Sequence, residues 1–182
     1  LATLTGRPVP VLFGRQRHSA VTFSYGPEVA LDPGPHLVGN CDALMTDASG
    51  VALAVEAPEE PIPAFADTER VDVVLNNLLG NAVRHTPAGG HVAVRVRRDG
   101  ASVRFEVQDT GEGIPRAYLE RIFERFFQVP GGKRGGLGLG LYISREIVQA
   151  HGGEMGVASE QGKGSVFWFT LPSAGDAPSA AR

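Results

Sequence analysis

The stretch that decides the fold is GGLGLGL, residues 135–141, which runs straight into YISREIVQAH, residues 142–151. Leu139, Ile143 and Ile147 recur with helical spacing, which predicts a helix behind a glycine-rich turn. Glycines at a helix start leave backbone N–H groups uncovered, and the helix N-terminus carries a partial positive charge. The run therefore favours a phosphate site, although a flexible loop before a packed helix has the same pattern.

A second helix is predicted upstream, over VVLNNLLGNAVRH at residues 73–85. Its apolar stripe is formed by Val71, Val74, Leu75, Leu78, Leu79 and Ala82. Asn77, Asn81, Arg84 and His85 follow one another at i, i+4, i+7 and i+8, so they share a separate polar face. A solvated helix face normally carries Glu and Lys, whereas two Asn beside a cation indicate metal and phosphate chemistry.

A strand ending in a carboxylate is the third feature. VRFEVQD, residues 103–109, alternates apolar and polar residues, as a half-buried strand does. It leads directly into DTGEGIP, residues 109–115, so Asp109 stands at the strand end and is followed by two glycines.

In this order the segments resemble the ATP-binding catalytic domain of sensor histidine kinases, in the superfamily that includes gyrase, the heat-shock-90 chaperones and MutL. The resemblance rests on an asparagine box (77–85), a first glycine box (109–113), a phenylalanine box (123–127) and a second glycine box (136–141). GKGSVFWFTLP, residues 162–172, is similar to the family's closing strand pair. The resemblance implies an α+β fold, a two-layer α/β sandwich of the Bergerat type with a mixed sheet and helices on one face.

The resemblance also implies roles at the adenine. Asp109 would accept a hydrogen bond from the exocyclic amine, with a plain turn-forming Asp as the alternative. Gly111 and Gly113 would let the backbone pass the base. Thr170 would bind adenine through water, or be an ordinary strand threonine. The remaining adenine-side residues implied are His85, as a stacking partner or a cap, and Ile114.

At the phosphates, the resemblance implies that Asn81 ligates Mg²⁺ through its amide oxygen. Asn77 would support it or pack helices, and Arg84 would face the phosphates as a fork of donors. Arg125 and Gln128 would approach the γ-phosphate. The phosphate cradle implied by the second glycine box is Gly136, Leu137, Gly138, Leu139 and Gly140.

Some residues depart from the family pattern. Leu137 stands where many relatives have Thr or Ser, and Gln128 where Arg is frequent. Lys133 and Arg134 could replace that cation or simply be solvated. Phe123, Phe126 and Phe127 are expected to anchor the lid by burying aromatic surface.

The implied function is transfer of the γ-phosphoryl group of Mg·ATP to a histidine on a dimerisation domain, for relay to a response regulator receiver domain. The asparagine box contains no Glu, the residue with which gyrase- and MutL-type relatives hydrolyse ATP. A regulatory nucleotide-binding module, or a superfamily ATPase without histidine transfer, is the alternative. An anti-sigma serine kinase is disfavoured by the phenylalanine box.

We divide the chain into an N-terminal segment of unclear fold (1–49), the ATP-binding domain (50–172) and a disordered tail (173–182). The N-terminal segment is either a small unrelated subdomain or part of an upstream segment. His18 and His36 have neither helical periodicity nor the acidic neighbour of a phospho-acceptor, so no acceptor is identified.

Composition excludes several partner classes. The 182 residues carry a net charge of −3, which gives no case for nucleic acid. No apolar run reaches membrane-spanning length, so we expect no direct membrane contact from this segment. The lone Cys41 suits a reducing compartment. A cytoplasmic location is expected, with any membrane anchor of the parent protein lying outside this sequence.

Capping residues, prolines and turn dipeptides predict where the remaining helices and strands begin and end. Asp67 or Thr68 should cap the first long helix, which ends before Pro87. The dipeptide Asp99-Gly100 predicts a hairpin turn. The predicted strands are 51–55, 64–66, 91–97, 102–108, 154–159 and 165–171, with a possible strand at 20–25, a short helix at 116–122 and a mobile loop at 129–136.

Overall fold

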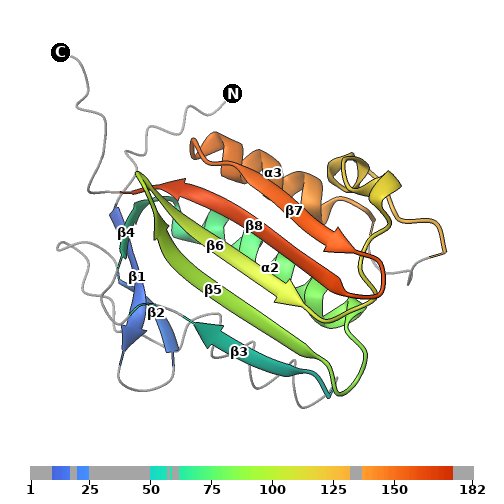
Figure 1. The fold of residues 1–182 in the computed structure, drawn as a ribbon. Coiled ribbons are helices and arrows are strands. Elements are labelled where there is room, and N and C mark those ends of the chain that lie inside the picture. The colour runs from blue at the N-terminus through green and yellow to red at the C-terminus, as the bar shows by residue number, and fades with distance from the viewer. Residues whose placement is uncertain are drawn as a thin grey trace.

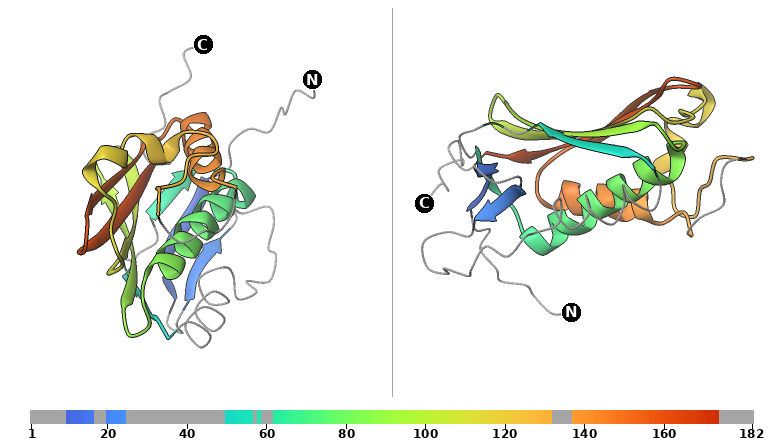
Figure 2. Two further views of the ribbon diagram at one scale, coloured as in Figure 1. Left: turned by 90° about the vertical axis from the view of Figure 1, so that its right-hand side faces the viewer. Right: turned by 90° about the horizontal axis from the view of Figure 1, so that it is seen from below.

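A five-stranded mixed sheet carries helices α2 and α3 on one face, so the domain has two layers (Figures 1 and 2). The computed structural model describes residues 10–16, 20–24, 50–56, 58, 62–131 and 137–173. The strand order of the sheet is β3-β5-β6-β8-β7, with β3 and β5 parallel and the other neighbours antiparallel. The elements are β1 (Pro10–Gln16), β2 (Ala20–Ser24), β3 (Ala52–Glu56), β4 (Ile62–Phe65), α2 (Thr68–His85), β5 (His91–Asp99), β6 (Ser102–Asp109), η1 (Arg116–Tyr118), η2 (Arg121–Phe123), α3 (Gly140–Ala150), β7 (Met155–Glu160) and β8 (Gly164–Pro172). The expected α+β sandwich is confirmed.

Helix α2 begins and ends where its capping residues predict. The Asp67 side chain accepts a hydrogen bond from the backbone N–H of Arg70 at 3.2 Å, which satisfies one of the free N–H groups of the first turn. At the other end the N–H of Thr86 bonds the Ala82 carbonyl, and Pro87 cannot continue the helix. The apolar stripe of α2 is buried as predicted, at residues Val71, Val74, Leu75, Leu78, Leu79 and Ala82.

Strict alternation along β6 and β8 decides which side chains face the helices. Phe105 pairs in register with Phe169, and their rings stack with centroids 4.5 Å apart inside the core. The same alternation sends Arg104 and Trp168 to the outer face, where the guanidinium lies 4.1 Å from the ring centroid. Inward positions of these strands therefore either build the core or, at the strand ends, line a site.

The connection between β6 and α3 differs from the prediction. Instead of one short helix at 116–122, the chain forms η1 and η2, two single turns of 3-10 helix. Each is closed by an i→i+3 bond, such as that from Glu124 N–H to the Arg121 carbonyl at 2.8 Å. Such short segments following Pro115 favour the tighter turn because an α-helix needs more residues to form its first bonds.

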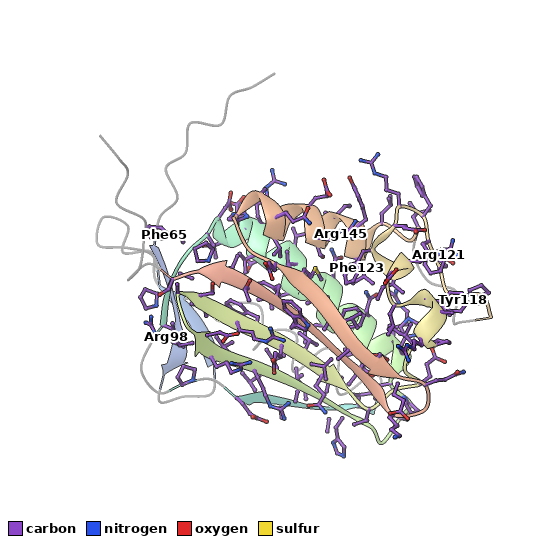
Figure 3. All side chains as sticks on the ribbon, turned by 45° about the horizontal axis from the view of Figure 1, so that its top comes forward. Phe65, Arg98, Tyr118, Arg121, Phe123 and Arg145 are labelled. Carbon is purple, nitrogen blue, oxygen red and sulfur yellow. The ribbon has the colours of Figure 1, made fainter. Side chains whose placement is uncertain are left out.

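The phenylalanine box is anchored by two of its three rings. Phe123 is buried beneath α3, where the Arg145 guanidinium lies 5.4 Å from its ring centroid (Figure 3). Phe127 is half-buried and packs against Tyr118, with ring centroids 5.8 Å apart. Phe126 is 68% exposed and has a positive φ of 61°, so the expectation that it anchors the lid by burial is wrong.

A second, three-stranded sheet with the order β2-β1-β4 lies beside the start of α2 (Figure 1). β4 therefore pairs with β1 and not with the main sheet. Ser173, which we assigned to the tail, is buried and forms a bridge with Ala64. Most of 1–49, residues 132–136 of the expected mobile loop and residues 174–182 lie outside the described residues. Within the described part, no helix is long and apolar enough to cross a membrane.

Candidate functional site

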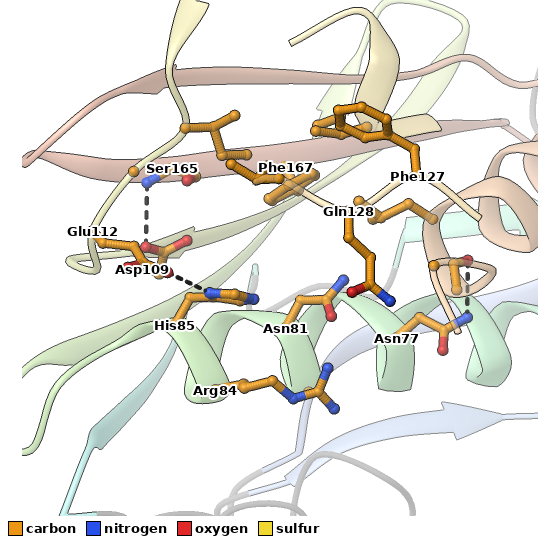
Figure 4. Close-up of a pocket in the computed structure, with 18 of the residues that line it drawn as sticks. Asn77, Asn81, Arg84, His85, Asp109, Glu112, Phe127, Gln128, Ser165 and Phe167 are labelled. Carbon is orange, nitrogen blue, oxygen red and sulfur yellow. Dashed lines mark hydrogen bonds and ion pairs between the residues drawn. The ribbon is translucent and has the colours of Figure 1, made fainter. Parts of the chain in front are cut away.

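A cavity of about 460 Å³ opens between the polar face of α2, the end of β6 and the start of α3 (Figure 4). Its volume is in the range of cofactor and substrate pockets. Of the residues predicted for the site, the cavity is lined by Asn77, Asn81, Arg84, His85, Asp109, Gly113, Ile114, Leu137, Gly138 and Gly140. The asparagine and glycine boxes, distant in sequence, are thus brought to one place.

Asp109 is the buried carboxylate of the cavity, with 4% of its surface exposed. Its Oδ1 accepts hydrogen bonds from the backbone N–H groups of Gly111 at 2.8 Å and Ser165 at 3.3 Å. Burial raises the pKa of Asp109, and these bonds, the charge of His85 and a bond from the Ser165 side chain oppose that rise. Because Oδ1 is occupied by backbone donors, we expect a ligand amine to meet Oδ2.

Asn77 and Asn81 occupy successive turns of α2 but differ in their contacts. The Asn77 amide nitrogen donates to the Gly140 carbonyl at 3.2 Å and to Ser144 Oγ at 3.1 Å, so it ties α2 to α3. This is the packing role that the sequence left open, although Asn77 also lines the cavity. The Asn81 amide points into the cavity near Gln128 (Figure 4).

His85 and Arg84 lie at the C-terminal end of α2. The His85 ring nitrogen Nδ1 lies 2.7 Å from Glu112 Oε1, and both residues line the cavity (Figure 4). Glu112 therefore belongs to the site, although the sequence analysis assigned it no role. Arg84 is exposed, and its guanidinium extends along the side of α2 away from Asp109.

The glycines of the first glycine box are required by the protein's own backbone. A Cβ on Gly111, which does not line the cavity, would lie 2.4 Å from the His85 carbonyl oxygen. Gly113 has a φ of +65°, and its Cβ would lie 2.1 Å from the Glu160 carbonyl oxygen. Both positions thus need glycine to let this loop pack against α2 and β7, whether or not a base lies nearby.

The second glycine box forms the entry to α3. Gly138 has a φ of +68°, and its carbonyl accepts the N–H of Phe126 at 2.9 Å. Leu139 is the N-cap of α3 and makes no side-chain capping bond, so the first backbone N–H groups of the helix have no side-chain partner there. Gly140 and Leu141 line the cavity, which directs this helix terminus toward it. Such a terminus suits a phosphate.

Four of the predicted residues that the structure describes do not line the cavity, namely Gly111, Leu139, Arg125 and Thr170. Leu139 caps α3, and Gly136 lies outside the described residues, as do Lys133 and Arg134. The Arg125 guanidinium bonds the Tyr142 hydroxyl and lies 4.5 Å from that ring's centroid, so it is stacked on α3. Gln128, the other candidate for the γ-phosphate, does line the cavity.

Thr170 is the fourth, and its position corrects the role we assigned to it. Its hydroxyl accepts the N–H of Glu154 at 3.0 Å, and alternation along β8 places it on the outer face of the sheet. Ser165, five residues earlier or about 16 Å along the strand, pairs with Asp109 and lines the cavity. Residues two apart on a strand face the same side, so the apolar Phe167 indicates in the sequence that Ser165 also faces inward.

A protein-family model, described as "Histidine kinase-, DNA gyrase B-, and HSP90-like ATPase", matches residues 66–175 of the chain. Among curated proteins, the alginate biosynthesis sensor protein KinB of Pseudomonas aeruginosa is 44% identical over 126 residues, covering 69% of this chain and 21% of KinB. The sensor histidine kinase WalK of Bacillus subtilis is 38% identical over 133 residues, covering 70% of this chain and 22% of WalK. The chain spans about a fifth of the length of these relatives.

Solved structures of sensor histidine kinases have a similar fold. The mycobacterial sensor histidine kinase MprB superposes with a TM-score of 0.62 at 29% identity, covering 72% of this chain and 87% of that chain. ShkA, solved in complex with AMPPNP, has a TM-score of 0.60 at 34% identity, covering 81% of this chain and 32% of ShkA. Sequence, fold and site geometry coincide: the chain belongs to the histidine kinase-, DNA gyrase B- and HSP90-like ATPase family, as an ATP-binding catalytic domain of the two-component sensor histidine kinase type.

Proposed function

We propose that this domain binds Mg·ATP and transfers its γ-phosphoryl group to a histidine on the dimerisation domain of its parent kinase, which then passes it to a response regulator receiver domain. The observation that carries the proposal is the arrangement of the cavity. Asp109 lies at one end of the cavity and the N-terminus of α3, which has no side-chain cap, at the other. The Asn81 amide lies between them. These groups suit an adenine amine, phosphate oxygens and a metal ion, respectively.

The residues present fit a magnesium ion shared with the phosphates. Mg²⁺ takes few protein ligands and keeps waters and substrate oxygens, and the amide oxygen of Asn81 is a hard ligand of that kind. In the described part of the chain no three His, Cys, Asp or Glu residues gather into a metal site. When bound, the ion would supply neutralisation of phosphate charge, with Asn81 as its protein ligand and Asn77 holding α2 against α3.

The distribution of carboxylates favours transfer over hydrolysis. The carboxylates lining the described cavity are Asp109 and Glu112, and both lie at the adenine end. Glu112 is engaged with His85 at 2.7 Å. Residues 132–136, GKRGG, contain no acid. Among the described lining residues, a water attacking the γ-phosphate would therefore find no carboxylate base at the phosphate end, whereas an imidazole is already a nucleophile and needs only positioning and charge neutralisation.

Leu137 and Gln128 support the second candidate, a nucleotide-binding module that has lost transfer, because each replaces a group expected to contact phosphate. Incubation of the domain with γ-labelled ATP and the purified dimerisation domain separates the possibilities. Acid-labile label on the dimerisation domain is the expected result. Binding with neither label nor phosphate release would favour the regulatory module, and phosphate release without label would favour an ATPase.

A further inference from the structure

Ser159 on β7 joins three segments around the adenine end of the cavity without lining the cavity itself. Its Oγ accepts the N–H of Ile114 at 2.8 Å and donates to the Gly164 carbonyl at 2.9 Å. The same oxygen lies 3.0 Å from Ser165 Oγ. One hydroxyl group therefore links a cavity wall at Ile114 with the strand that carries Ser165.

The number of protons on each hydroxyl decides which serine donates in the hydrogen bond between Ser159 and Ser165. A hydroxyl has one proton and two lone pairs. The proton of Ser159 goes to the Gly164 carbonyl, and one lone pair takes the N–H of Ile114. The remaining lone pair faces Ser165, so Ser165 is the donor when this bond forms. The backbone N–H of Ser165 donates to Asp109 Oδ1 at 3.3 Å, so the residue that meets Ser159 is also bonded to the buried carboxylate.

The surrounding backbones are too close to absorb a shift. The N–H of Gly162, in the β7–β8 turn, donates to the Glu112 carbonyl at 2.7 Å. A Cβ on Gly164 would lie 2.1 Å from the Asp109 carbonyl oxygen, and one on Gly113 would lie 2.1 Å from the Glu160 carbonyl oxygen. The loop over 111–114 and the β7–β8 turn are therefore in direct backbone contact, and Ser159 adds a side-chain bond from β7 to this loop.

We propose that Ser159 is a positioning residue for base recognition. Its hydroxyl holds the Gly113–Ile114 wall at a fixed spacing from Asp109 and Ser165. The proposal rests on the proposed function only in taking an adenine nucleotide as the occupant of the cavity. It extends base recognition to a residue that does not line the cavity.

The test compares Ser159→Ala with two matched variants. Ser159→Thr keeps the hydroxyl and should bind like the wild type. Ser173→Ala removes the hydroxyl of a buried serine, bonded to Arg98 and the Pro63 carbonyl, eight residues beyond Ser165 and about 26 Å away along the strand. It should lower stability without changing nucleotide affinity.

Calorimetry is carried out with Mg·ATP, Mg·GTP and Mg·tripolyphosphate. We expect Ser159→Ala to weaken ATP binding by about three- to tenfold, the worth of one hydrogen bond. The ATP-to-GTP preference should fall, and tripolyphosphate affinity should stay within about twofold. A purely structural role would lower all three affinities together, in step with stability.

A second readout needs no nucleotide. Loss of its acceptor should speed hydrogen exchange at the Ile114 amide in Ser159→Ala, and not in Ser159→Thr or Ser173→Ala. Unchanged exchange at Ile114, an unchanged ATP-to-GTP ratio or an equal loss of tripolyphosphate affinity would overturn the proposal. Failure of the wild type to bind ATP would instead overturn the proposed function, and the exchange data would still decide whether Ser159 holds the loop.

Discussion

Replacing Asp109 with Asn should separate base recognition from folding. Asn keeps an oxygen that can accept the N–H groups of Gly111 and Ser165, now bonded to Oδ1 at 2.8 and 3.3 Å. Those two donors fix the amide orientation, because its NH₂ group cannot face them. The NH₂ group therefore takes the place of Oδ2 and meets the adenine amine donor to donor.

The magnitude follows from the lost charged acceptor. A hydrogen bond to a charged group is worth about 1.5–3 kcal/mol, which corresponds to a loss of ATP affinity of about 10- to 160-fold. Tripolyphosphate affinity should not change, and GTP should gain relative to ATP because the guanine oxygen can accept from the new NH₂ group. Calorimetry with the three ligands measures this. An unchanged preference for ATP would mean that Asp109 is only a turn residue.

Asp109→Asn should weaken ATP binding without lowering the free energy of unfolding. Burial raises the pKa of Asp109 above its ordinary 3.8. The protonated carboxyl thus favours the fold below that pH, and this contribution is lost as pH rises through the folded-state pKa. At neutral pH the desolvated charge is a cost that an amide does not carry. Urea unfolding at pH 7 should find Asp109→Asn at least as stable as the wild type, and a large loss would contradict the assigned bonding.

The remaining predictions concern the metal, the acceptor and α2. ATP should bind more weakly in EDTA than in Mg²⁺, and equal affinities by calorimetry would remove the metal role of Asn81. The isolated chain should bind nucleotide without labelling itself from γ-labelled ATP, whereas added dimerisation domain should become labelled at high concentration; acid-labile label on this chain that disappears in His18→Gln or His36→Gln would refute this. Gly80→Ala should raise the free energy of unfolding by about 0.5–1 kcal/mol, since Gly80 is inside a helix and, apart from the helix's own backbone, no atom of the described residues lies within 4 Å of its Cβ position. Thermal and urea unfolding measure that change, and destabilisation would mean that the space is needed by the fold.

Local signals were sufficient where one residue type decides the geometry. Asp67 and Pro87 set the ends of α2, and Asp99-Gly100 sets the β5–β6 hairpin, so these elements appear within a residue or two of the prediction. The polar face of α2 followed from helical periodicity alone. Each of these features depends on sequence neighbours and not on what packs against them.

Local signals were not sufficient where the position of a side chain depends on partners distant in the chain. Thr170 and Ser165 are both strand hydroxyls, and only the register with β6 shows that Ser165 meets Asp109. Arg125 has the charge expected near a γ-phosphate, but Tyr142, seventeen residues later, provides a ring on which it stacks. Phe126 was expected in the core because of its type, whereas the bond from its N–H to Gly138 fixes a backbone that turns the ring outward.

The two ends of the cavity are built differently, and this divides the proposed function between the domain and its assembly. At the adenine end, Gly111, Gly113 and Gly164 bring backbones so close that a Cβ would meet a carbonyl oxygen at 2.1–2.4 Å. That end is set before any ligand arrives, so base selectivity should be a property of this chain alone. At the phosphate end the described contributions are a helix terminus, the amides of α2 and the exposed Arg84, with no carboxylate to activate a nucleophile. Transfer should therefore require the nucleophile to be delivered by another domain, and variants at the adenine end should change which nucleotide is used without changing where its phosphate goes.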